Sequence, residues 1–160
     1  MRKINLNPLI KKSSKIMYYE KDNYYYVAID GLIIIRFDVY DFFTAVSERK
    51  IKEQKEENER IYTLYNEIIS NKGIEDIKDT TYQKNMFEDE YKIFKTPNHY
   101  KYVNTKFTNL LNDSLYEYDL LSTDSPVSPV YARHQKEKIS FVLMPTRVNK
   151  ENFEFVLKED

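Results

Sequence analysis

Residues 102–111 read YVNTKFTNLL and residues 139–148 read ISFVLMPTRV, and these two stretches determine the fold that the sequence predicts. The first predicts a strand that runs into a short helix, because Asn104 can cap the helix. Apolar side chains then recur at i, i+3 and i+4 from Phe107, as on the buried side of a helix. The second stretch predicts an apolar strand that ends at a Met-Pro sequence.

The rest of the chain repeats this order of helix and strands. Asn7 and Pro8 favour a first helix over residues 6–14, since Asn caps a helix and Pro is tolerated at its first position. Asp30-Gly31 between two apolar runs is a strong hairpin signal. We therefore expect strands at residues 16–20, 24–29 and 32–37, and again at 115–121, 127–133 and 139–143. The prediction is a single α+β domain over residues 1–160.

Two segments lie outside this repeat. Residues 41–72 predict a helical insertion: its first half, 47–60, is almost wholly polar, and its second half has an apolar stripe that begins at Ile61. The polar half is either a solvated arm or a partner-binding helix, and Gly73 is expected to end the segment. Residues 74–97 have only weak strand signals. In the tail, residues 149–160, apolar and polar residues alternate as they do in a strand.

Composition narrows the class of protein. The 160 residues include 41% hydrophobic residues, two glycines and no cysteine. Nucleotide-binding loops need several glycines close together, and thiolate sites need cysteine, so neither is expected. No apolar run approaches the length that spans a bilayer, and the N-terminus lacks a secretory signal. The expectation is a protein of the bacterial host cytoplasm, with a composition typical of a low-GC bacterium or its phage.

Catalytic chemistry is not expected from the remaining residues. His99 and His134 are far apart and lie in no metal-binding spacing, and no serine lies in a nucleophile elbow. We therefore predict no enzyme activity, no metal and no cofactor. Acidic clusters at 88–90 and 119–124 are interpreted as solvated loops rather than a nuclease site. Tyrosines at 18–19 and 24–26 could stack single-stranded bases, but alternating tyrosines on a sheet are more often half-buried packing residues with a solvated hydroxyl.

The net charge of −1 is unevenly distributed. Residues 1–19 and 91–112 contain lysines and no acidic residue. This asymmetry favours a local DNA-facing surface on a nearly neutral protein, although ordinary solvated lysines are an equal alternative. The candidate DNA-facing residues are Lys11, Lys12, Lys15, Lys101 and Lys106.

The ordered combination of these elements resembles the last domain of the bacterial DNA-polymerase sliding clamp, the β subunit of the replicative polymerase. The resemblance covers residues 6–37 and 100–148 and includes Tyr26–Gly31, Val103–Leu111 and the Met144-Pro145-Thr146-Arg147 ending. It implies two halves, each a helix plus a small antiparallel sheet, with the helices toward DNA. Clamps bind phosphates without base readout, which the scattered lysines would suit.

The resemblance also implies a cleft that accepts short partner peptides, bordered by Val142, Met144, Pro145 and Arg147. Adaptable Met side chains suit such a site. The alternative is that Val142 and Met144 are core residues of an edge strand.

The function expected from the resemblance is that of a DNA-replication accessory or processivity factor that binds double-stranded DNA non-specifically. Clamp rings contain six such domains, so a ring would require a homo-oligomer. The alternative is a phage regulatory or counter-defence protein that binds and inhibits a host replication or defence protein. The insertion and the tail have no counterpart in the clamp and favour this alternative.

Overall fold

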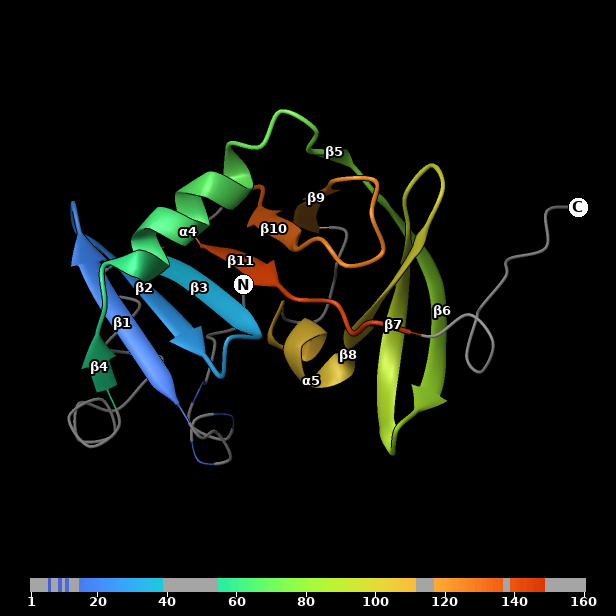
Figure 1. Cartoon of the computed structure of the whole chain (residues 1–160), viewed down its shortest axis with the longest axis horizontal. Coiled ribbons are helices and arrows are strands. Elements are labelled where there is room, and N and C mark those ends of the chain that lie inside the picture. Colours follow the sequence, from blue (N-terminus) through green and yellow to red (C-terminus); the bar gives the residue numbers. More distant parts are fainter. Residues whose placement is uncertain are drawn as a thin grey trace, which may run out of the picture.

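The structure is a computed structural model that describes residues 6, 9, 11, 15–38, 55–111, 117–136 and 139–148. It is a mixed, mostly β fold of two sheets (Figure 1). The larger sheet has eight strands in the spatial order β4-β1-β2-β3-β11-β10-β9-β5, antiparallel except for the β4–β1 pair. Its strands are β1 (Ile16–Lys21), β2 (Tyr24–Ile29), β3 (Ile33–Asp38), β4 (Lys55–Glu57), β5 (Glu75–Asp76), β9 (Tyr118–Ser122), β10 (Val130–His134) and β11 (Ser140–Leu143).

The smaller sheet is antiparallel and contains β6 (Lys78–Met86), β7 (Asp89–Lys95) and β8 (Tyr100–Asn104). Besides the helical residues Leu9 and Lys11, the described part of the chain contains α4 (Arg60–Ile69), α5 (Thr105–Thr108) and the short 3-10 helix η1 (Asn109–Leu111). The expectation of α and antiparallel β structure is therefore confirmed at this coarse level.

The larger sheet consists of two meanders that meet at its centre. β1–β2–β3 and β9–β10–β11 each fold from consecutive strands, and the pairing of β3 with β11 joins them. The register places Ile34 opposite Val142 and Arg36 opposite Ser140. This confirms the predicted strands, with shifts of a few residues at their ends.

Side chains on the two faces of the larger sheet enter different clusters. One face packs against η1, α5 and one side of the smaller sheet, through residues such as Phe107, Leu111 and Phe94. The opposite face packs against α4, whose Ile61 and Tyr65 are buried against Ala28, Ile34 and Val142. The molecule is therefore layered, with α4 on one side of the sheet and α5 on the other.

The predicted hairpin turns of the first meander are confirmed. Asp22 and Asn23 join β1 to β2, and both have positive φ. Asp30 and Gly31 also have positive φ, and Leu32 N donates to Ile29 O at 3.0 Å across this turn. Asn, Asp and Gly tolerate this conformation better than other residues, so these turns follow directly from the sequence.

The predicted passage from strand to helix at Asn104 is also confirmed. Asn104 Oδ1 accepts a hydrogen bond from Lys106 N at 3.0 Å, as an N-cap does. Phe107 and Leu111 are buried, and Leu110 packs against the same cluster. Lys106 and Asn109 are exposed on the opposite side of this helical stretch.

The predicted insertion differs from the structure in two respects. Residues 55–57, expected to be polar helix or arm, form β4 and pair in parallel with β1. The helix ends at Ile69, with Ser70 as C-cap, so Gly73 lies beyond it and does not cap it. The apolar stripe that begins at Ile61 correctly predicted the helix itself.

The segment with weak strand signals forms the longest hairpin in the described part of the chain. The pairing of β6 with β7 runs from Lys78 opposite Lys95 to Met86 opposite Asp89. The register shifts between Asp79 and Gln83. This hairpin was not predicted, because its turn residues, Phe87 and Glu88, are not turn formers. Other expectations fall outside the described residues: most of the first helix (of which Leu9 and Lys11 are helical), residues 39–54 and the tail 149–160.

Among the described residues, no helix has the length and apolar character needed to cross a membrane.

Tyr65 ties α4 to the sheet through a buried hydrogen bond. Its hydroxyl lies 2.5 Å from Ser140 Oγ, and the side chain is in contact with the rings of Tyr26 and Tyr131. Burial raises the pKa of Tyr65, so the hydroxyl remains protonated over the usual pH range.

We expect Tyr65→Phe to lower the free energy of unfolding by about 1–2 kcal/mol, because Ser140 would lose its buried partner. The double variant Tyr65→Phe/Ser140→Ala should lose less free energy of unfolding than the two single variants lose in sum. The difference, the coupling energy, should be about 1 kcal/mol. Denaturant unfolding of the four proteins measures this cycle. Tyr62→Phe on the same helix is the control, and strictly additive losses would contradict the prediction.

Candidate functional site

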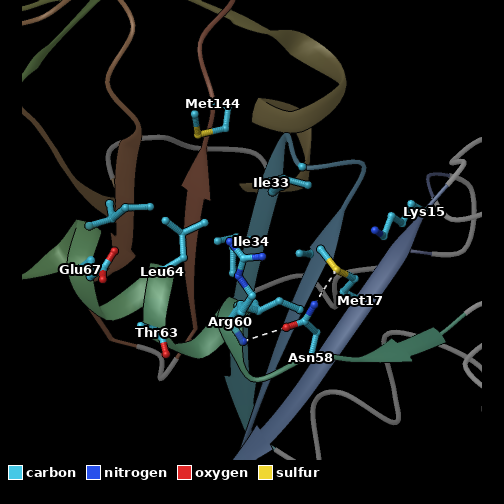
Figure 2. A pocket seen from close by; sticks show the side chains of 14 residues that line it. Lys15, Met17, Ile33, Ile34, Asn58, Arg60, Thr63, Leu64, Glu67 and Met144 are labelled. Atoms are coloured by element: carbon cyan, nitrogen blue, oxygen red, sulfur yellow. Dashed lines mark hydrogen bonds between the residues drawn. The ribbon is translucent and has the colours of Figure 1, made fainter.

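A groove lies between α4 and the surface of the larger sheet, at the end where β2 turns into β3 and the chain leaves β11. Its volume is about 470 Å³. Figure 2 shows that residues of β1, β3 and α4 and the Met144 side chain after β11 surround it. We call it the α4 groove. Its apolar lining consists of Met17, Ala28, Ile33, Ile34, Ile61, Leu64, Ile68 and Met144, and its polar lining of Lys15, Asn58, Arg60, Thr63 and Glu67 together with Gly31.

The floor of the groove is apolar because the sheet residues beneath it belong to the α4 side of the core. Ala28, Ile34 and Ile61 are buried there. Leu64 is different: it points along the groove and is 49% exposed. A large exposed leucine above an apolar floor is the feature of a surface that another apolar group can cover.

The polar rim is held by the start of α4. Asn58 Oδ1 accepts from Arg60 N at 2.9 Å, and Asn58 Nδ2 lies 3.5 Å from Met17 Sδ (Figure 2). Lys15 and Arg60 bring two positive charges to the rim, and Glu67 brings one negative charge. Lys15 N also donates to Asp30 Oδ1 at 2.7 Å, so this end of the groove carries charges of both signs.

The structure places the predicted cleft residues in different environments. Met144 lines the α4 groove, half-buried. Val142 is fully buried beneath α4, so its prediction as a cleft residue was wrong and its alternative as a core residue is correct. Pro145 is half-buried and Arg147 exposed, and neither lines the groove. The reason is that the chain crosses here to the smaller sheet, where Thr146 N donates to Tyr102 O at 2.7 Å.

The predicted DNA-facing lysines do not share one surface. Lys11 and Lys106 are exposed, and Lys106 Nζ lies 4.9 Å from the Phe107 ring centroid. Lys15 is exposed on the α4 side of the sheet, away from α5. Lys12 lies outside the described residues.

Lys101 is not DNA-facing, and this prediction was wrong. Its side chain is 0% exposed because it faces the inside of the smaller sheet, toward the loop of residues 123–129. Its ammonium donates to the carbonyl oxygens of Ser125 and Ser128 and to Ser128 Oγ, the last at 2.7 Å. Burial lowers the pKa of Lys101 to about 8, and nearby Asp124 acts in the opposite direction. The lysine therefore anchors the loop.

The same loop is held from its other end by Asp124. Thr96 Oγ1 donates to Asp124 Oδ1 at 2.6 Å, Asn98 Nδ2 donates to Oδ2 at 2.6 Å, and His99 Nδ1 lies 3.0 Å from Oδ1. These hydrogen bonds hold the pKa of Asp124 well below its usual range, and the one from Thr96 has the largest effect. Asp124 is therefore a structural acceptor, although the sequence placed it in a solvated acidic cluster.

The remaining candidate groups are dispersed. His134 Nε2 lies 3.3 Å from Glu117 Oε2, and Asp119 pairs with Arg133 at 3.0 Å. Glu88, Asp89 and Glu90 are exposed at the β6–β7 turn. Within the described ranges, no group of three or more His, Asp or Glu side chains is arranged to hold a metal ion.

Sequence reasoning missed the α4 side of the groove. Asn58 and Arg60 were treated as parts of the polar half of the insertion and Leu64 as part of the apolar stripe, and Glu67 was not singled out. The helical stripe places Leu64 on the same side as Ile61 and Ile68, but periodicity does not tell which member of a stripe lies at its exposed margin.

Comparison with known proteins gives no matching family, no matching curated protein and no matching solved structure.

We expect Lys101→Ala to lower the free energy of unfolding by about 2–4 kcal/mol, because it removes a buried aliphatic stem and leaves two carbonyl groups without their donor. The control is Lys106→Ala, an exposed lysine close in sequence, which should change stability by about 0.5 kcal/mol or less. Denaturant unfolding measures both. Equal effects of the two changes would contradict the buried role of Lys101.

Proposed function

We propose that this chain is a non-enzymatic, clamp-like protein that acts in DNA replication as an accessory factor and binds duplex DNA without sequence preference. The observation that supports it is the pairing of two three-stranded meanders in one sheet, each preceded in the chain by helical residues. Leu9, from the first helical stretch, packs against the same apolar cluster as Phe107 and Leu111 of the second. This arrangement is what the resemblance to a clamp domain leads one to expect.

The charge on this layer fits the proposal. Lys11 and Lys106 are both exposed, and the helical stretches that contain them contribute Leu9, Phe107 and Leu111 to the same apolar cluster. The sequence between Tyr91 and Leu111 contains no acidic residue that would oppose a phosphate. Lysines without base-reading partners provide attraction to the DNA backbone alone, which a sliding protein requires.

The prediction is that Lys11→Glu combined with Lys106→Glu weakens binding to a short duplex about tenfold or more at low salt, because two phosphate contacts are lost and two repulsive charges are introduced. Fluorescence anisotropy at several salt concentrations measures this. Lys72→Glu combined with Lys136→Glu changes the net charge equally at exposed positions elsewhere. Equal weakening by both pairs, or no binding by the parent protein, would reject the DNA-binding proposal.

A second candidate function is supported by the α4 groove. Under this second function, the chain is a regulatory or counter-defence protein that binds a short peptide segment of a host protein. The apolar floor, the exposed Leu64 and the half-buried Met144 offer a place for one or two apolar side chains. Arg60, which also lines the groove, favours an acidic residue beside it.

This candidate predicts that a displayed library of short peptides yields apolar sequences with an acidic residue, and that Leu64→Glu reduces their binding about tenfold or more. Val127→Glu is the matched control, since Val127 is also an exposed apolar residue but lies outside the groove. Calorimetry on the selected peptides compares the two variants. Peptides that bind both variants equally would remove the groove as the binding site.

A further inference from the structure

The hydroxyl of Ser128 lies against the amino group of Lys101. Ser128 Oγ and Lys101 Nζ are 2.7 Å apart. Lys101 belongs to β8 and Ser128 to the loop between β9 and β10, so the fold brings together two residues that are distant in sequence. The distance is within the range over which a base takes a proton from a hydroxyl nucleophile. The two side chains therefore have the geometry of an activated serine.

Lys101 is buried without a carboxylate in hydrogen-bond contact. Its side chain is 0% exposed, and besides Ser128 Oγ its amino group contacts only the carbonyl oxygens of Ser125 and Ser128 among the described residues. Buried lysines are ordinarily paired with an acid, because an unpaired charge is costly to remove from water. A lysine in this environment is suited to exist as the neutral amine, which is the form that acts as a base.

Asp124 is the charged group that acts on Lys101, and it does not neutralise the lysine directly. Its carboxylate oxygens are engaged by other side chains, those of Thr96, Asn98 and His99. Burial lowers the pKa of Lys101 to about 8 although Asp124 acts in the opposite direction. About one chain in ten therefore carries the neutral amine at pH 7, and most chains carry it above pH 9.

The contacts of Lys101 suit both of its protonation states. The ammonium has three N–H donors, one for each of its three oxygen partners. The neutral amine keeps two donors for the two carbonyl oxygens, and its lone pair then accepts from the Ser128 hydroxyl. Ser128 Oγ also donates to Thr123 O at 3.3 Å, a long contact that a rotation of the hydroxyl exchanges for the amine. Proton transfer thus requires no movement of the loop.

A small reagent can meet the serine but not the lysine. Ser128 is half-buried and follows two exposed residues, Pro126 and Val127. Lys101 lies behind it, fully enclosed. Ser122 Oγ, 3.4 Å from Ser128 Oγ, is also fully buried. Of these side chains, Ser128 is therefore the one from which a bond to an external molecule can form.

We infer that Ser128 is an acylation site, a serine that takes the acyl group of a small activated ester while Lys101 accepts its proton. Ser128 Oγ forms a bond to the acyl carbon, and the bond between that carbon and the ester oxygen breaks. The alkoxide or phenolate leaves with the electron pair of that bond, and the hydroxyl proton passes to Lys101 Nζ. One acyl group is taken up per chain, which is compatible with a binding protein and requires neither of the functions proposed above.

The test treats the full-length protein with p-nitrophenyl acetate at several pH values and stops the reaction with acid. Mass spectrometry of proteolytic peptides then measures acetylation at Ser128, with Ser70, an exposed serine after α4, as the reference in the same digests. The variants are Ser128→Ala and Lys101→Arg, since arginine keeps a cationic donor that cannot be neutralised. Lys106→Arg, at an exposed lysine, is the matched control. Thermal unfolding confirms that each variant is folded.

We expect Ser128 to be acetylated at least about tenfold faster than Ser70 at pH 8, and Lys101→Arg, but not Lys106→Arg, to remove this advantage. The rate at Ser128 should rise with pH and level off above about 8, because Lys101 is then neutral. Equal rates at Ser128 and Ser70, an unchanged rate in Lys101→Arg, or a rate that keeps rising with pH would overturn the inference. If Lys101→Arg does not fold, the pH profile of the parent protein decides.

Discussion

The pairing of β3 with β11 is the constraint on which the rest of the structure depends. It joins two meanders from opposite ends of the described chain, so it closes a long loop and must recover that entropic cost through side chains on both faces. On one face Ile35 and Phe141 enter the core beneath α5, and on the other Ile34 and Val142 lie beneath α4. The same pairing brings Ser140 to Tyr65 and Met144 to the α4 groove.

Local chemistry explains which parts of the fold could be predicted. The turns at Asp22-Asn23 and Asp30-Gly31 and the cap at Asn104 depend on residues that favour those backbone conformations by themselves, so sequence was sufficient. The β6–β7 hairpin has the same turn geometry at Phe87-Glu88, where intrinsic preference opposes it. A pattern-based prediction fails there because contacts along two long strands, rather than the turn residues, determine the conformation.

The candidate site shows the same division. The resemblance implied a peptide-binding cleft bordered by Val142 and Met144; Met144 lines the α4 groove, whereas Val142 lies beneath it as core. Lys101 was predicted on the surface because charged residues usually lie there, yet its ammonium is fully enclosed by loop carbonyls. Neither result could be read from spacing, since each depends on which loop or helix covers a strand after folding.

The edges of the sheets have a consequence for how copies of this protein can meet. Among the described residues, the larger sheet ends in β4 and β5, which contain three and two residues. The longer edge at β6 is interrupted by a register shift next to Thr81, a residue with positive φ. Short and irregular edges offer few aligned backbone groups to a foreign strand, which disfavours strand addition at β4, β5 and β6. At these edges, contacts with another chain depend on side chains, so single substitutions can change them without altering any sheet.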